Sequence, residues 1–182
     1  MKVEPGQLEG LLLIQPRVHG DARGWFCESW NEARYREAGI AGQFVQDNFS
    51  FSHRGVLRGL HFQNPNPQGK LVMVLAGEVW DVAVDLRRRS PTFARWQGVQ
   101  LSGEARNQFY LPPGFAHGFV VLSETALFHY KCTAPYSPGD EVCLRWDDPD
   151  LAIAWPVRNP ILSARDAAAP RLRDLPAERL FP

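Results

Sequence analysis

The stretch LVMVLAGEVWDVAVDL, at residues 71–86, predicts how this chain folds. Its first part, Leu71–Ala76, is a continuous apolar run whose length is typical of a strand buried on both faces. In residues 79–86, the even-numbered positions are all apolar, while the odd-numbered positions include Asp81 and Asp85. This period of two is typical of a half-buried strand. Gly77-Glu78 then predicts a tight connection between two strands.

Short strands of this kind recur along the chain. The sequence has fifteen Gly and fifteen Pro, which supply turns between them. Many short strands with Gly/Pro turns and little helix are typical of an antiparallel sandwich or barrel. The sequence therefore predicts an all-β fold, with the jelly roll among the leading choices. The further predicted strands are Gly10–Gln15, Gly24–Trp30, Phe44–Asn48, Val56–Gln63, Trp96–Leu101, Gln108–Leu111, Phe119–Leu122, Ala126–Thr133 and Glu141–Trp146.

Helix signals are few. Asn31 is a typical N-cap and predicts a helix over Glu32–Ala38, which Gly39 would end. Ser163 is a second N-cap candidate and predicts a short helix over Ala164–Ala169. A length of 182 residues with no repeat and no low-complexity linker indicates one domain, 1–182. We expect the Pro- and Arg-rich tail, residues 170–182, to pack loosely on the surface.

Composition excludes several function classes. Twenty basic residues balance twenty acidic ones, so no global field attracts nucleic acid or an anionic membrane. The only uninterrupted apolar run near the N-terminus, Leu11–Ile14, is too short for a signal peptide or a membrane span. Cys27, Cys132 and Cys143 lack metal-ligand spacing and predict buried thiols in a reducing compartment. We expect a cytoplasmic protein.

Residues 46–63, QDNFSFSHRGVLRGLHFQ, carry the main functional signal. Two arginines, two histidines and three amides stand among Gly and apolar positions that indicate strands. Folding so many polar groups inward costs free energy unless they are paired or meet a polar ligand. The stretch therefore predicts a pocket for something anionic and polar.

Two motifs resemble those of the cupin jelly rolls, which usually bind a metal. The first has His61-Phe62-Gln63 where cupins have HxH, so an amide replaces the second histidine. The second keeps the PxGxxH shape through Pro112, Gly114 and His117. Two imidazoles without a convergent carboxylate are a poor site for a divalent metal, which takes three or four ligands. We expect no metal and no cofactor.

With GLHFQ at 59–63, QGK at 68–70, LPPGFAHGF at 111–119 and SARD at 163–166, the chain resembles the dTDP-4-dehydrorhamnose 3,5-epimerase family. The likeness runs from about Leu11 to Asp166 with the motifs in order. It implies a cupin-like jelly-roll barrel or sandwich with a few short helices. It also implies cofactor-independent epimerisation at C3 and C5 beside the C4 ketone of a dTDP-4-keto-6-deoxyhexose.

The resemblance implies four catalytic residues. His61 matches the general base, and Asp166 the carboxylate that orients its imidazole. Tyr130 matches the acid that donates from the other side, and Lys70 the cation near the developing enolate oxygen. Each of the four also has a purely structural alternative. His61 could be a strand histidine with its hydrogen bonds satisfied, and Tyr130 could be a core residue. Lys70 could be a solvated strand end, and Asp166 could only interact with the helix dipole.

The resemblance also implies a binding set for the nucleoside diphosphate sugar. Forked cationic donors suit the diphosphate. In the family, the N-terminal segment crosses to a second subunit, which implies a homodimer with a shared active site in which residues 1–30 contribute contacts. The matching positions are Arg23, Phe26, Glu28, Gln46, Asp47, Asn48, Arg58, His117, Tyr136, Glu141 and Arg165. A salt link between turn and strand is the structural alternative for Arg23 and Glu28.

One departure from the family is Phe49, where a histidine often follows the Asn. Its loss would remove a polar contact near the sugar, which leaves open a relative that epimerises one carbon only or acts on another nucleotide-linked sugar. A non-catalytic sugar-binding or metal-binding cupin is a third reading. It is disfavoured because a binding module needs no acid–base set.

Overall fold

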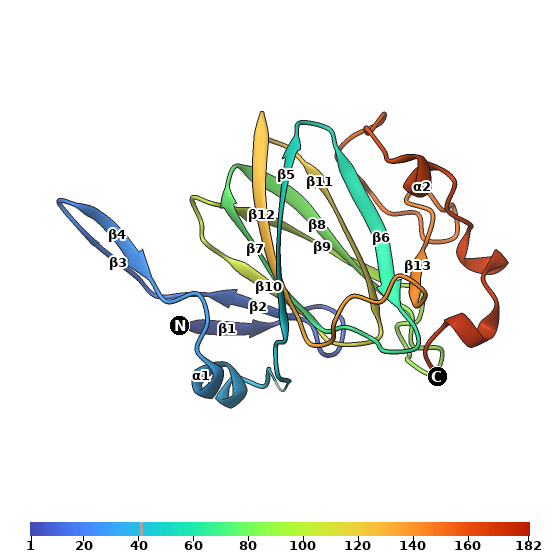
Figure 1. Cartoon of the computed structure of the whole chain (residues 1–182), viewed down its shortest axis with the longest axis horizontal. Coiled ribbons are helices and arrows are strands. Elements are labelled where there is room, and N and C mark those ends of the chain that lie inside the picture. Colours follow the sequence, from blue (N-terminus) through green and yellow to red (C-terminus); the bar gives the residue numbers. More distant parts are fainter. Residues whose placement is uncertain (41) are drawn as a thin grey trace.

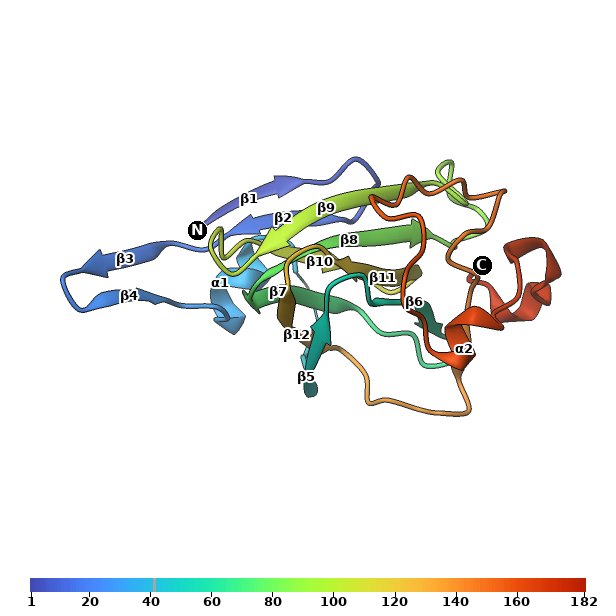
Figure 2. The same cartoon turned by 90° about the horizontal axis from the view of Figure 1, so that it is seen from above.

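Two antiparallel β-sheets face each other in the computed structural model, which describes residues 1–40 and 42–182 (Figures 1 and 2). Together with two short helices, they confirm the predicted all-β jelly-roll architecture. The six-stranded sheet has the order β1 (Lys2–Pro5), β2 (Leu12–Gln15), β10 (Gln108–Leu111), β7 (Lys70–Ala76), β12 (Thr125–Cys132) and β5 (Gln46–His53). The five-stranded sheet has the order β13 (Glu141–Cys143), β6 (Leu57–Gln63), β11 (Phe115–Val121), β8 (Glu78–Asp85) and β9 (Trp96–Ser102).

The stretch at residues 71–86 joins the two sheets. β7 lies in the six-stranded sheet and β8 in the five-stranded one, so the tight connection between them is a corner where the chain changes sheet. Gly77 at this corner has φ +82°, and a Cβ there would lie 2.0 Å from the carbonyl oxygen of Thr125. Only glycine fits both the backbone angle and the close approach.

The core fills the space between the sheets. Val72, Phe109 and Phe128 of the six-stranded sheet pack against Ala83 and Phe119 of the five-stranded one, all at most 4% exposed. The rings of Phe119 and Phe128 stack with centroids 4.1 Å apart. Since burying one such side chain contributes about 1.5–3 kcal/mol, this layer holds the two walls of the molecule at a fixed separation.

The prediction for the C-terminal tail is wrong. Its two 3₁₀ turns, η1 (Leu172–Asp174) and η2 (Ala177–Arg179), place Leu172, Leu180 and Phe181 at 8% exposure or less against the outer face of the five-stranded sheet. The tail forms the right-hand edge in Figure 1. The tail and the segment around Leu151 share one apolar cluster with the outward side of β8, so this strand is not half-buried as its alternation predicts.

Both predicted helix caps are confirmed. Asn31 Oδ1 accepts from the Arg34 amide at 3.2 Å to begin α1 (Glu32–Glu37), and Ser163 Oγ accepts from the Asp166 amide at 3.0 Å to begin α2 (Ala164–Ala167). The helix before Gly39 thus ends one residue earlier than predicted, and α2 two residues earlier. No helix in the described residues is long and apolar enough to cross a membrane.

Strand boundaries differ more than helix boundaries. β5 continues to His53, five residues past its predicted end, because its register with β12 continues to Thr125. The strand predicted over Gly24–Trp30 ends at Cys27 and forms a protruding hairpin with a strand that was not predicted. This hairpin, β3 (Val18–Asp21) and β4 (Gly24–Cys27), extends from the body at the upper left of Figure 1. β1 was also not predicted, β11 begins four residues early, and β13 ends three residues early.

Candidate active site

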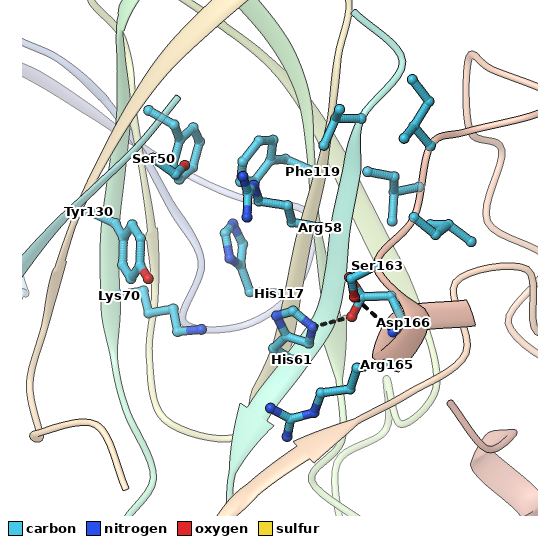
Figure 3. Close-up of a pocket in the computed structure, with 15 residues that line it drawn as sticks. Ser50, Arg58, His61, Lys70, His117, Phe119, Tyr130, Ser163, Arg165 and Asp166 are labelled. Atoms are coloured by element: carbon cyan, nitrogen blue, oxygen red, sulfur yellow. Dashed lines mark hydrogen bonds and ion pairs between the residues drawn. The ribbon is translucent and has the colours of Figure 1, made fainter. Parts of the chain in front are cut away.

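A cavity of about 400 Å³ opens between the two sheets (Figure 3). Because successive side chains of a strand point to opposite faces, each sheet turns every second residue inward. The pairing of β6 with β11 shifts register between His117 and Phe119, and this irregularity lets both Arg58 and His61 line the cavity. The polar groups that line it are Ser50, Arg58, His61, Lys70, His117, Tyr130, Ser163, Arg165 and Asp166.

His61 and Asp166 form a hydrogen-bonded pair on one wall of the cavity. His61 Nε2 lies 2.6 Å from Asp166 Oδ1, with the imidazole 28% exposed and the carboxylate buried. Burial by itself lowers the pKa of His61, but the bond to Asp166, helped by the Cys143 thiol, raises that pKa to about 9. Burial also acts to raise the pKa of Asp166, yet its bond to His61 keeps it below the ordinary value. The pair therefore supplies a strongly basic imidazole facing open space.

Lys70 and Tyr130 lie on the opposite wall. They belong to β7 and β12 of the six-stranded sheet, and both point into the cavity across from His61 (Figure 3). Burial lowers the pKa of Lys70, partly opposed by the nearby acidic groups Cys132, Glu141 and Asp81. Burial also raises the pKa of Tyr130. This wall thus carries an amine and a protonated hydroxyl in a poorly solvated place.

The sequence reasoning missed Asp81, the partner of His117. Asp81 Oδ2 lies 2.8 Å from His117 Nε2, and the two side chains are 0% and 8% exposed. The other oxygen, Oδ1, has no hydrogen-bond partner in the described residues. The available signal was an acidic residue at a strand position flanked by apolar neighbours on both faces, because a buried carboxylate needs a partner.

A second, more polar hollow of about 340 Å³ shares His61, Lys70, Tyr130 and Arg165 with the first cavity. Its far side holds Tyr136, whose hydroxyl donates to Glu141 Oε2 at 2.7 Å. Arg165 forms an ion pair with the same carboxylate. The predicted binding residues that the structure brings to this hollow are Gln46, Asn48, Tyr136, Glu141 and Arg165. The two hollows form one continuous site, with the two walls at its centre.

Asp47 and Phe49 lie on the other face of β5, away from the cavity. Asp47 accepts two hydrogen bonds from Lys131 at 2.7 Å, and Phe49 is 64% exposed, with its ring 4.8 Å from that of His129. The alternation along β5 sends Asn48 and Ser50 inward and these two outward. Within one chain, Phe49 therefore does not line the cavity or contact a sugar bound there.

Three predicted binding residues lie far from the cavity of their own chain. Arg23 sits at the tip of the β3–β4 hairpin, paired with Asp21 at 2.6 Å and with a side chain 90% exposed. Phe26 is 69% exposed, and Glu28 pairs with Arg34 at 2.7 Å. None of the three lines either hollow of its own chain.

The metal position expected of a cupin does not fit these residues. Gln63 Oε1 accepts from the Ser137 amide at 2.9 Å, while its Nε2 donates to the carbonyl oxygen of Asn66 at 3.0 Å. The Nε2 atoms of His61 and His117 are bonded to different carboxylates. A metal at that position would lack the second histidine, and the side-chain amide of Gln63 that replaces it is already held by its hydrogen bonds to Ser137 and Asn66, so we derive no catalytic step through a metal.

Comparison with known proteins agrees with this geometry. Residues 5–174 match the family described as dTDP-4-dehydrorhamnose 3,5-epimerase. The protein of that name from Pseudomonas aeruginosa is 54% identical over 168 residues, which cover 91% of this chain and 93% of that protein. A crystal structure of dTDP-6-deoxy-D-glucose-3,5-epimerase from Legionella pneumophila, in complex with dTDP-4-keto-L-rhamnose, superposes with a TM-score of 0.96 at 54% identity. It covers 99% of this chain and 97% of its own.

A more distant structure is also similar. ChmJ, a 3'-monoepimerase from Streptomyces bikiniensis in complex with dTDP-quinovose, has a TM-score of 0.87 at 38% identity, covering 93% of this chain and 87% of its own. The fold is thus shared by relatives of different epimerase scope. The match over residues 5–174 and the identity to the Pseudomonas protein show that this chain belongs to the dTDP-4-dehydrorhamnose 3,5-epimerase family.

Proposed function

We propose that this protein epimerises C3 and C5 of a dTDP-4-keto-6-deoxyhexose without a cofactor. The observation that carries the proposal is the opposition of two walls, with the His61–Asp166 pair on one and Tyr130 with Lys70 on the other. Inversion at carbon requires the new proton to arrive on the face opposite the one from which the old proton left. Two facing walls with different proton chemistry meet that requirement.

The reaction would proceed in two proton transfers at each carbon. Neutral His61 removes the proton beside the C4 ketone, and the electrons of the C–H bond move onto the ketone oxygen to form an enolate. The ammonium of Lys70 stabilises that negative charge in a site that excludes much of the water. Tyr130 then donates its hydroxyl proton to the other face of the carbon, and solvent restores both groups.

The polar hollow would hold the nucleotide. Arg58 and Arg165 supply guanidinium groups at the cavity, and a guanidinium suits a diphosphate because it can donate two parallel hydrogen bonds. The amides Gln46 and Asn48, already linked at 2.9 Å, and the half-exposed ring of Tyr136 offer hydrogen bonds and stacking for a pyrimidine base. The sugar would then lie deeper, between the two walls.

The protein would act as a homodimer with shared sites. Trp25 and Phe26 of the protruding hairpin are 56% and 69% exposed, and Phe49 and Phe51 expose more than half of their area on the outer face of β5. Exposed aromatic groups of this size favour burial against another chain. A second copy would also bring Arg23 and Phe26 to the nucleotide. The free thiols are consistent with our expectation of a cytoplasmic location.

Deuterium uptake tests the proposed reaction. The protein is incubated in heavy water with dTDP-4-keto-6-deoxyglucose, and the positions of deuterium in the sugar are read by NMR. A 3,5-epimerase incorporates deuterium at both C3 and C5 and inverts both centres. Incorporation at one carbon only would support a single-carbon epimerase, an alternative favoured by the similarity to ChmJ. No incorporation at either carbon would contradict the proposal.

Sedimentation tests the assembly separately. We expect a dimer, and we expect Arg23→Ala to weaken substrate binding although Arg23 is distant from the cavity of its own chain. A stable monomer with full activity would contradict the shared site.

A further inference from the structure

Three metal-ligating side chains of different chemistry converge at the edge of the cavity. One nitrogen of His61, the sulfur of Cys143 and one oxygen of Asp166 all lie within 4.8 Å of one another. We propose that these three residues bind Zn²⁺ and that the bound ion inhibits the enzyme. The ion would be an inhibitor and not a cofactor, and its site differs from the metal position of a cupin.

The fold places these residues together from three separate elements. Cys143 in β13 stands directly opposite His61 in β6, and directly opposed residues of antiparallel strands project from the same face of the sheet. Asp166 comes from the first turn of α2, where the bond between Ser163 Oγ and the Asp166 amide fixes the backbone. β13 lies beside β6 at the edge of the five-stranded sheet, and His61 and Asp166 line the same side of the cavity (Figure 3).

The donor set suits zinc. Thiolate, imidazole and carboxylate are the three zinc ligands of proteins, with bonds of about 2.3 Å to sulfur and about 2.0–2.2 Å to nitrogen and oxygen. Ligand atoms around a tetrahedral zinc are therefore about 3.3–3.6 Å apart. His61 Nε2 and Asp166 Oδ1, now at 2.6 Å, would separate by about 0.8 Å, and side-chain rotation would bring the Cys143 sulfur to the same spacing.

Binding would displace protons and leave one position open. Zinc would take the place of the thiol proton of Cys143 and of the proton shared by His61 and Asp166, and both protons would leave to solvent. Three protein ligands leave a fourth position for water from the cavity. Arg165, a neighbouring cation, is already paired with Glu141, so its charge is partly offset.

The inhibition rests on the proposed function, whereas the binding does not. Zinc on Nε2 would leave the one proton of the neutral ring on Nδ1, so His61 would have no free lone pair to take a proton from carbon, and the metal would also occupy Asp166. Substrate could still enter the polar hollow, because most of its lining is not part of the metal site. Zinc would therefore lower the turnover rate more than it would weaken nucleotide binding.

Two cysteine variants test the site. Cys143→Ser replaces the sulfur with a poor zinc ligand. Cys132→Ser is the matched control, since Cys132 is also buried but belongs to β12 of the opposite, six-stranded sheet. Co²⁺ is added to each metal-free protein, and the sulfur-to-cobalt charge-transfer absorption is recorded. We expect this band in the unchanged protein and in Cys132→Ser, but not in Cys143→Ser.

Zinc inhibition is measured on the same three proteins, each relative to its own rate with a chelator. We expect the half-inhibitory zinc concentration to rise more than about 100-fold in Cys143→Ser, because changing a residue that merely supports a ligand already costs about 10–100-fold in metal affinity. Cys132→Ser should match the unchanged protein. A cobalt band that persists in Cys143→Ser, or no band in the unchanged protein, would overturn the site. A protein that shows the band but no epimerase activity would contradict the proposed function alone.

Discussion

The two walls of the cavity shift the pKa values of their side chains in different ways. On the five-stranded side, a buried carboxylate bonds to His61 and raises the pKa of its imidazole to about 9. On the six-stranded side, burial dominates: it lowers the pKa of Lys70 and raises that of Tyr130. One wall is therefore built to accept a proton and the other to donate one and to stabilise negative charge. The same β-sandwich core holds both, so the asymmetry comes from the groups behind each side chain.

Removing the base should produce the largest effect. We expect His61→Ala to lower kcat by about 10²–10⁴-fold, because the other imidazole among the described residues that line the cavity, His117, is buried and bonded to Asp81. The measurement is the turnover rate with a circular dichroism spectrum of the variant. His53→Ala, an exposed histidine at the end of β5, serves as the control and should keep its rate. A near-native rate in His61→Ala would place the base elsewhere.

Removing the cation from the facing wall should cost somewhat less. We expect Lys70→Met to lower kcat by about 10²–10³-fold, since a preorganised group beside a developing oxyanion is worth that much in other enzymes. Lys70→Arg keeps the charge and should recover part of the loss. Equal losses in both variants would mean that Lys70 acts through its shape and not through its charge.

Weakening the carboxylate behind the base should have a smaller effect. Asp166→Asn keeps the volume but replaces an anion with a neutral amide, so we expect a loss of about 10–10²-fold in kcat and a lower pKa of His61. The variant should remain folded, because Ser163 still caps α2 through the backbone amide of residue 166. An unchanged rate with an unchanged pKa would show that Asp166 does not tune the base.

The pH dependence sharpens the same contrast. The base must be neutral to act, and the folded pKa of His61 is raised, so the imidazole is mostly protonated at neutral pH. We therefore expect kcat/KM, measured with a chelator present, to rise about tenfold per pH unit above pH 7 and to level off near pH 9. In Asp166→Asn the plateau should begin at lower pH. A flat profile between pH 7 and pH 9 would contradict a raised pKa.

The sequence predicts the parts of this molecule that depend on local signals. Asn31 and Ser163 mark the two helix starts, because an N-cap depends only on one side chain and a backbone amide two or three residues further on. The motifs around His61, Lys70 and Asp166 predict the cavity for a similar reason. The alternation along β5 could also have predicted that Asp47 and Phe49 point away from Asn48.

What the sequence could not predict depends on pairing between distant segments. The partnership of Asp81 with His117 needs the register of β8 with β11, and the approach of Cys143 to His61 needs that of β13 with β6. The burial of Leu180 and Phe181 depends on the outer face of the five-stranded sheet, which forms only when distant strands pair. The local sequence indicates that Asp81 needs a partner, but it does not identify the partner in this or in the other long-range pairings.

The central claim, that one wall removes the proton and the other returns it, is tested most directly by Tyr130→Phe. The phenyl ring keeps the packing beside Phe128 but has no proton to donate. In heavy water, we predict that this variant still exchanges the acidic protons of the substrate through His61, while net inversion at C3 and C5 falls steeply. Inversion of both centres at the native rate would contradict the account, because the donor would then be water or another side chain.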